Sequence, residues 1–194
     1  GISNNGAIRN VSDANTLSGL ITLAADSEIQ IDSGSTLTMN VASGNAITGT
    51  DNLTIESIGT SSIADPIATS TGTLTKTGAG TLTLSGTNTY TGSTTISVGT
   101  ISLTNANGLG TTAGTTTIES GAQLTIATGL TVAENINISG TGISSAGVIN
   151  STGAITLSGD INVVATSSIT TTGNLTFSGN IVKTSGSNAT LTIS

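Results

Sequence analysis

Three carboxylates in one short segment are the residues of this chain whose types and spacing best suit chemistry. Asp26, Glu28 and Asp32 form its densest group of acids. Asp26 and Glu28 are two positions apart, so in a strand they share one face, where paired carboxylates act as general acid and base or bind a cation. The competing interpretation is solubilising charge at the end of a strand. We favour it because no catalytic or metal-binding partner accompanies these acids.

The basic residues do not complete such a site. The chain contains no histidine and no cysteine, and its three cations, Arg9, Lys76 and Lys183, are far apart in the sequence. This excludes histidine-based catalysis and histidine metal ligands, and no glycine-rich calcium repeat occurs. Lys76 stands beside a glycine turn, where we expect a structural role. The sequence therefore predicts no catalytic, cofactor-binding or metal-binding residue, and we expect a protein that is not an enzyme.

Threonines at alternate positions predict a different kind of surface. Flat ranks of outward threonine on a β-solenoid resemble ice-binding surfaces, although outward threonine is also simply a favourable strand residue. The irregular spacing of the pairs along the chain favours the second interpretation. The pairs are Thr36/Thr38, Thr73/Thr75, Thr81/Thr83, Thr115/Thr117 and Thr190/Thr192.

The composition is typical of a folded and weakly acidic β-protein. Hydrophobic residues make up 35% of the chain and charged residues 7%, against roughly 25% charged residues in ordinary soluble domains. The only aromatic rings, Tyr90 and Phe177, leave the core to aliphatic side chains, which fill a narrow solenoid better than a two-layer sandwich. A net charge of -7 argues against nucleic acid or anionic membrane as partners. We find no apolar run long enough for a transmembrane segment and no signal peptide.

Short strands must position these residues. Triplets of the apolar-polar-apolar type, such as Ile21-Thr-Leu23, Leu82-Thr-Leu84 and Ile136-Asn-Ile138, recur along the whole chain. Each triplet directs two apolar side chains to one face of a strand and one polar side chain to the other. The short corners between triplets fit either antiparallel hairpins or a coil that turns the same way at every corner.

Two observations favour the coil. Internal repeats are present, because Ile31–Met39 recurs as Ile118–Ile126 and Asn15–Gly19 recurs as Asn88–Gly92. Hairpin signals are scarce, since Asn-Gly occurs only twice and Asp-Gly never. The sequence therefore predicts an all-β chain in which residues 1–194 form one continuous, single-stranded parallel β-helix.

The predicted helix has about three short strands and about 20 residues in each rung, which gives roughly ten rungs. We expect irregular loops or a bulged rung at Ala42–Gly49 and at Ile58–Ser70, which contains Pro66. The glycines Gly78, Gly80, Gly86 and Gly92 are expected at corners.

One segment resembles a known family. Leu74–Gly92, with the sequence LTKTGAGTLTLSGTNTYTG, and Thr95–Leu103, with the sequence TISVGTISL, resemble the autotransporter-associated β-strand repeat of bacterial autotransporter passenger domains. Gly6–Asp26 is similar to a segment that precedes this repeat in large passenger-like proteins. The resemblance implies a right-handed parallel β-helix, displayed on or released from a bacterial surface, that serves adhesion, aggregation or display. The family's export signal and C-terminal barrel are not found in these residues.

These observations lead to one functional expectation and two alternatives. We expect an extracellular structural or adhesive β-solenoid, a surface stalk or filament-forming protein. Its end rungs lack caps, which predicts tandem continuation or end-to-end self-association, and a host-cell, matrix or polysaccharide surface is a further candidate partner. The first alternative is a carbohydrate-binding or polysaccharide-degrading β-helix that uses Asp26, Glu28 and Asp32, which the scarcity of aromatic rings disfavours. The lesser alternative is the ice-binding threonine array.

Overall fold

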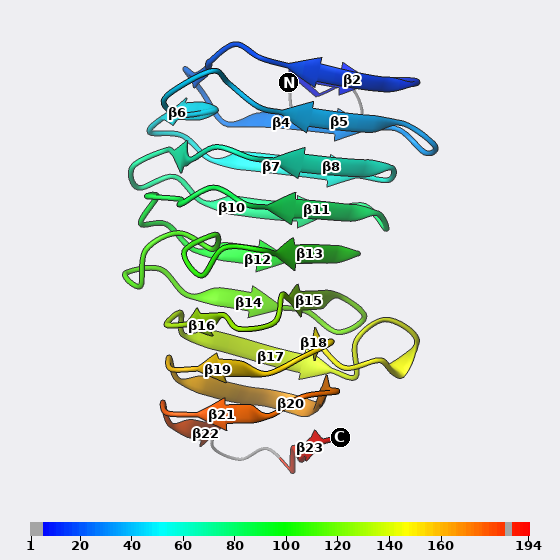
Figure 1. The fold of residues 1–194 in the computed structure, drawn as a ribbon, viewed down its shortest axis with the longest axis vertical. Coiled ribbons are helices and arrows are strands. Elements are labelled where there is room, and N and C mark those ends of the chain that lie inside the picture. The colour runs from blue at the N-terminus through cyan, green and yellow to red at the C-terminus, as the bar shows by residue number, and fades with distance from the viewer. Residues whose placement is uncertain (1–5, 185–187) are drawn as a thin grey trace.

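The structure, a computed structural model, describes residues 6–184 and 188–194. The chain winds as a right-handed parallel β-helix of about eight turns, and its two ends lie at opposite ends of a rod (Figure 1). We call each full turn a rung and name it by its strand on the first face. The predicted fold class is confirmed.

The first face is an uninterrupted ladder in which every strand pairs in parallel with the strand one rung later. Alternating side chains on these strands point into the rod and away from it. The strands are β1 (Ile8–Asn10), β4 (Ser27–Ile31), β7 (Leu53–Ser57), β10 (Leu74–Thr77), β12 (Thr94–Ile96), β14 (Thr116–Ile118), β17 (Ile136–Gly140), the first part of β20 (Ile161–Thr171) and β22 (Ile181–Lys183).

The second face is an equally continuous parallel ladder, which faces the viewer in Figure 1. Its strands are β2 (Ala14–Leu17), β5 (Thr36–Met39), β8 (Thr60–Ile63), β11 (Thr81–Leu84), β13 (Thr100–Leu103), β15 (Gln123–Ile126), β18 (Ile149–Ser151), the second part of β20 and β23 (Leu191–Ile193).

The third face consists of two short ladders. The first contains β3 (Ile21–Leu23), β6 (Ile47–Gly49) and β9 (Ile67–Ala68), and the second contains β16 (Thr131–Val132), β19 (Ile155–Leu157) and β21 (Leu175–Phe177). Between them, the β10 and β12 rungs cross this face without a strand. A short 3-10 helix, η1 (Ile143–Ser145), follows β17.

The core is a set of stacked aliphatic columns that run along the rod. In one column Ile29 stacks on Ile55, and further along Ile96 stacks on Ile118 and then on Ile138, each of them almost completely buried. Burying such a side chain contributes about 1.5–3 kcal/mol relative to exposing it. The columns replace the bulky aromatic core of a sandwich, as the composition predicts.

The predicted number of rungs was too high because some rungs contain more than the expected value of about 20 residues. Ile29 pairs with Ile55, which follows it by 26 residues, whereas Lys76 pairs with Ile96, which follows it by 20 residues. The longer rungs carry extra residues at their corners, including the segment that precedes β6.

The loop predictions for Ala42–Gly49 and Ile58–Ser70 were wrong for the part of each stretch that forms strands. The first contains β6, and the second contains β8 and β9. The pattern was hidden because β8 directs Ser61, and not an apolar residue, into the core. A buried serine breaks the apolar alternation that identifies a strand in the sequence.

One of the two predicted internal repeats has a structural counterpart. Leu37 and Leu124, from the repeated segments Ile31–Met39 and Ile118–Ile126, lie in the same column of the second face. By contrast, Asn15 lies in β2 on the second face, while Asn88 lies in the irregular crossing of the third face. The two copies of that second repeat therefore do not occupy equivalent positions in the rod.

Within the described ranges, none of the helical structure has the length and hydrophobicity that crossing a membrane requires.

Candidate functional site

Lys76 lies inside the rod. Its side chain is fully buried, and its neighbours in the column of the first face are Ile55 of β7 and Ile96 of β12. A lysine in an aliphatic column must find partners for its ammonium group or lose its charge, because an unpaired buried charge is very costly.

The Lys76 ammonium finds these partners at the corner between the first and second faces. Its Nζ donates to the carbonyl oxygens of Thr77 and Gly78 at 2.6 and 2.7 Å. It also lies 3.4 Å from the carbonyl oxygen of Ser57 and 3.2 Å from that of Val98, which belong to the preceding and following rungs. The ammonium thus joins three consecutive rungs. Burial lowers the pKa of Lys76 to about 8, against the opposing effect of the Glu56 carboxylate.

Small side chains in the preceding rung make room for the lysine. Ser57 and Ser61 are fully buried, and their hydroxyl groups hydrogen-bond to each other. Ser61 occupies a column position that Leu37 and Leu82 hold in the adjacent rungs. We infer that the exchange of leucine for serine and the presence of the lysine are coupled.

Two glycines shape the same corner. Gly78 has a φ of 74°, and a Cβ atom there would lie 2.6 Å from the carbonyl oxygen of Ser57. A Cβ at Gly80 would lie 1.9 Å from the carbonyl oxygen of Gly59. These positions require glycine, which agrees with the predicted corner role.

The Lys76 corner, with its lysine, threonine and glycines, opens a segment that matches a known family. Residues 74–103 match the passenger-associated-transport-repeat. The match agrees with the resemblance found in the sequence and spans β10 to β13. No curated protein and no solved structure matches the chain. The protein is thus a parallel β-helix with a segment that matches the passenger-associated-transport-repeat.

The passenger-associated repeat also explains how the third face continues without a strand. Asn88 accepts a hydrogen bond from the backbone amide of Ile67 at 2.8 Å and donates one to the carbonyl oxygen of Gly108 at 2.5 Å. Its amide therefore links the rungs on either side, as a backbone ladder would. Tyr90, in the same irregular crossing, is fully buried, and its hydroxyl group lies 2.7 Å from the Thr94 hydroxyl oxygen.

Lys183 lies in the same column as Lys76. Successive register pairs connect Lys76 to Ile96, and the column continues through Val163 to Lys183 in β22. Lys183 is exposed, in contrast to Lys76. Sequence reasoning treated the two lysines as unrelated, although both stand two residues into a first-face strand and precede a threonine.

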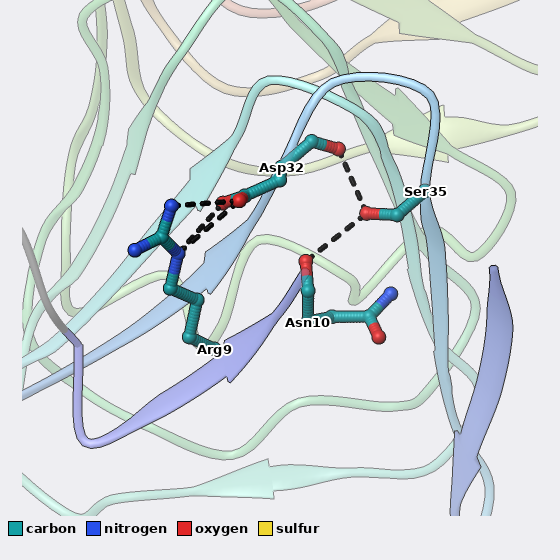
Figure 2. Close-up of polar contacts among 4 residues, drawn as sticks. All are labelled: Arg9, Asn10, Asp32 and Ser35. Atoms are coloured by element: carbon teal, nitrogen blue, oxygen red, sulfur yellow. Dashed lines mark hydrogen bonds and ion pairs between the residues drawn. The ribbon is translucent and has the colours of Figure 1, made fainter. Parts of the chain in front are cut away.

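The structure does not bring Asp26, Glu28 and Asp32 together as one site. Asp32, which follows β4, forms a bidentate ion pair with Arg9 of the preceding rung, at 3.0 and 2.7 Å from its Nε and Nη2 atoms (Figure 2). The hydrogen bonds from Arg9 lower the pKa of Asp32. Beside this pair, the Ser35 hydroxyl lies 2.7 Å from the carbonyl oxygen of Asp32 and 3.1 Å from that of Asn10.

The other two acids have different partners. Asp26, which precedes β4, accepts hydrogen bonds from the backbone and side-chain amides of Asn52 at 2.9 and 3.1 Å, and the backbone bond is the main reason that its pKa is lowered. Glu28 is buried near Glu56, whose pKa is raised by burial and by the Glu28 charge. In the described ranges no group of three acids, histidines or cysteines is placed to hold a metal ion.

Two of the predicted threonine pairs, Thr36/Thr38 and Thr81/Thr83, belong to ranks that are more regular than the spacing of the pairs in the sequence. On the second face, polar residues that alternate with buried ones stack in register through five successive rungs. Rungs of unequal length cause the irregular sequence spacing, and the strand register removes it. One rank contains Thr38, Ser62, Thr83, Ser102 and Thr125, and beside it lie Thr36, Thr60, Thr81 and Thr100. Thr75 and Thr117 belong to the first face, and Thr192 to β23.

Open grooves lie on the outer surface of the part of the chain that the structure describes, and two of them are well defined. One, of about 270 Å³, lies on the third face along Leu130, Ile155 and Thr176. The other, of about 250 Å³, lies along Ser102, Ile126 and Asn150. No aromatic or charged side chain lines either groove.

Sequence reasoning also missed a buried carboxyl group at a corner of the rod. Glu134, at the corner before β17, is 4% exposed, and burial raises its pKa to about 7. Its signal in the sequence is weak: it stands two residues before a first-face strand, where Gly92, Gly114 and Gly159 stand in other rungs.

Proposed function

We propose that this protein is an extracellular bacterial β-solenoid that acts as a surface stalk or display rod, without enzymatic activity. The proposal rests above all on one observation: a passenger-associated repeat is built into an uninterrupted parallel ladder on two faces of the rod. Each rung in such a ladder contacts only its neighbours, so the ladder holds every rung at a defined distance along the rod.

The interior supports a mechanical role. Buried side chains in the core columns and at the Lys76 corner join one rung to the next. On the surface, Asp26 and Asp32 form similar links between rungs. Of the acids that are candidates for catalysis, Asp26 and Asp32 are engaged in these contacts.

The proposal includes stacking of further rungs on the ends of the rod. Ile181 and Ile193 are 49% and 52% exposed, although their column neighbours Ile161 and Ile169 are buried. The unpaired edges of β22 and β23 present backbone groups that another rung can satisfy. Lys183 occupies the position from which Lys76 reaches the carbonyl oxygen of Val98 in the following rung. The occupant is either a continuation of the solenoid or a second copy.

Electron microscopy of the native material, with immunogold labelling of intact cells, tests this function. We expect surface labelling and rods with a rise of about 4.8 Å per rung along their axis. Labelling confined to the cytoplasm, or compact particles in place of rods, would contradict the proposal.

A second candidate function is ice binding, because the threonine ranks of the second face are in register. The ranks repeat about 4.8 Å along the rod, and alternate residues stand about 6.7 Å apart across it, so hydroxyl groups form a two-dimensional array. Thermal hysteresis and ice-crystal shaping would be measured for the whole chain and for Thr83→Lys, with Thr117→Lys on the first face as the matched control. An effect that only Thr83→Lys abolishes supports this function, and no hysteresis in the unmodified chain rejects it.

A further inference from the structure

The corner between the third and first faces is lined by glycines whose neighbours leave no room for a side chain. A Cβ atom at Gly114 would lie 2.4 Å from the carbonyl oxygen of Gly92. A Cβ at Gly159 would lie 2.1 Å from the carbonyl oxygen of Glu134. Glu134 carries a side chain in this series, as Asp51 does two residues before β7, and the register of β14 and β17 places Glu134 next to Gly114. Gly114 provides space for it because it has no side chain of its own.

The carboxyl group of Glu134 is buried without a protein partner at one oxygen. Its Oε1 atom is inaccessible to solvent and accepts no hydrogen bond from any side chain or backbone amide. A buried polar atom without a partner costs about 1–3 kcal/mol, so each one in a native structure requires an explanation.

Two hydroxyl groups near this corner also lack a hydrogen-bond partner. Thr116, fully buried at the start of β14, has no partner for its Oγ1 atom, and neither has Oγ1 of Thr111. The backbone amide of Thr116 donates to the carbonyl oxygen of Asn135, the residue after Glu134, at 2.9 Å. Thr116, at the start of the β14 rung, and Glu134, at its end, are therefore neighbours across one step of the ladder, and no direct hydrogen bond joins their side chains.

Tyr90 and Thr94 lie on the opposite side of this rung. The Tyr90 hydroxyl group is 2.7 Å from Oγ1 of Thr94, which donates to the carbonyl oxygen of Leu109 at 3.1 Å, so these groups are satisfied. Thr94 is the column neighbour of Thr116. The backbone amide of Thr111 donates to the carbonyl oxygen of Tyr90 at 2.9 Å, and this bond holds Thr111 next to Tyr90. The charge of Glu134 adds to the burial that raises the pKa of the Tyr90 phenol, so the two groups share one interior region.

We propose that the interior of the β14 rung is a binding site for a single water molecule, which joins the Glu134 carboxyl group to the hydroxyl groups of Thr116 and Thr111. A buried water needs two to four polar partners, and these three oxygens supply them. No direct hydrogen bond joins Thr116 and Glu134, and a bridging water would give each of their unpaired oxygens a partner. One carboxyl group with two neutral hydroxyls is a poor set of ligands for a divalent metal, and no three-ligand metal cluster occurs in the described part of the chain.

A double-mutant cycle on the whole chain tests the site. Thr116→Val removes the hydroxyl group at almost constant volume, and Glu134→Leu removes the carboxyl group and displaces the water. Thr117→Val, at the next position of the same strand, is the matched control, because Thr117 points away from the core. The folding equilibrium constant would be measured at pH 6, where the Glu134 carboxyl group is largely protonated.

We expect Thr116→Val to lower the folding constant about fivefold in the natural chain, the equivalent of one net hydrogen bond, and to have no such effect in the Glu134→Leu chain. Equal losses in both backgrounds would overturn the proposal, because the two groups would then be independent.

The unmodified protein provides a second test that does not depend on how the variants fold. A high-resolution crystal structure should show one water molecule within hydrogen-bonding distance of Glu134 and Thr116. A dry interior there would refute the site. Melting curves in sodium, potassium and choline chloride at equal ionic strength should coincide; stabilisation by sodium or potassium alone would identify the occupant as a monovalent cation and overturn the assignment to water.

Discussion

Lys76 and Glu134 are two ionisable side chains enclosed in the same rod, two rungs apart, and they are accommodated in opposite ways. Four carbonyl oxygens from three rungs surround the Lys76 ammonium, whereas Oε1 of Glu134 has no protein partner. Burial shifts both pKa values towards neutrality, that of Lys76 to about 8 and that of Glu134 to about 7. The comparison teaches that a solenoid interior accepts a charged residue where the corner itself presents backbone oxygens, and otherwise requires a neutral form or an added ligand.

The largest expected effect comes from removing the better-partnered group. Lys76→Ala leaves several carbonyl oxygens without their donor and opens a cavity, so we expect a loss of about 3–5 kcal/mol in the free energy of unfolding, measured by denaturant titration. Lys183→Ala is the matched control, because it changes the same column position on an exposed residue and should cost less than about 0.5 kcal/mol. Similar losses for both variants would remove the distinction between the two lysines.

The Glu134 carboxyl group should make the rod less stable as the pH rises. Its folded pKa of about 7 lies above the ordinary value of 4.5, so the folded state holds the proton more tightly, and its contribution to stability is complete below about pH 4.5 and lost by about pH 7. The shift sets an upper limit of roughly 3 kcal/mol on the loss. Unfolding titrations between pH 4.5 and 7.5 should show this slope in the natural chain and lose it in Glu134→Gln. An unchanged slope in that variant would mean that other acids cause it.

Lys76 should produce the opposite dependence at higher pH. Its folded pKa of about 8 lies below the ordinary 10.5, so the unfolded chain binds the proton more tightly and stability rises between about pH 8 and 10.5. Because the carbonyl oxygens hold the ammonium, we expect a rise smaller than the change at Glu134. Lys76→Met should remove the rise while Lys183→Met retains it, and a rise that survives Lys76→Met would contradict the assignment.

A change at Ser61 sharpens the account of how the lysine fits. Ser61→Leu restores the residue found at the adjacent column positions but fills the space next to the Lys76 side chain, so we expect a loss of about 1–3 kcal/mol. In a Lys76→Ile background the same change should cost much less. Equal costs in the two backgrounds would show that serine and lysine are not coupled.

The smallest effect is expected at the surface. Asp32→Asn breaks the exposed ion pair with Arg9 and should shift the thermal midpoint very little, because solvent screens such pairs. A shift comparable to that of Lys76→Ala would mean that the first rungs depend on this pair.

The sequence predicted the architecture well because the features that define it are local. Triplets such as Leu82-Thr-Leu84 identify strands without reference to the rest of the chain, and the scarcity of hairpin turns indicates parallel stacking. The Lys76 segment carried the family resemblance, and its corner glycines were placed correctly. Prediction failed at Ser61, since a buried serine interrupts the apolar alternation by which a strand is identified from the sequence.

The interior site around Glu134 could not be predicted either. Nothing in its neighbourhood in the sequence distinguishes it from Glu119, which lies outside the core. Only the register of β14 and β17 places Glu134 beside Thr116 and in a series of glycines. Strand register also turned unevenly spaced threonines into ranks and made Lys183 the counterpart of Lys76.

Competitive amine labelling of the native protein, read by mass spectrometry at each lysine, compares the two counterparts in one experiment. We expect Lys183 to be modified rapidly, and Lys76 to stay protected until the rod unfolds, since its ammonium is enclosed by the passenger-associated repeat. Rapid labelling of Lys76 in the folded protein, at a rate close to that of Lys183, would contradict the enclosed lysine and the corner built around it.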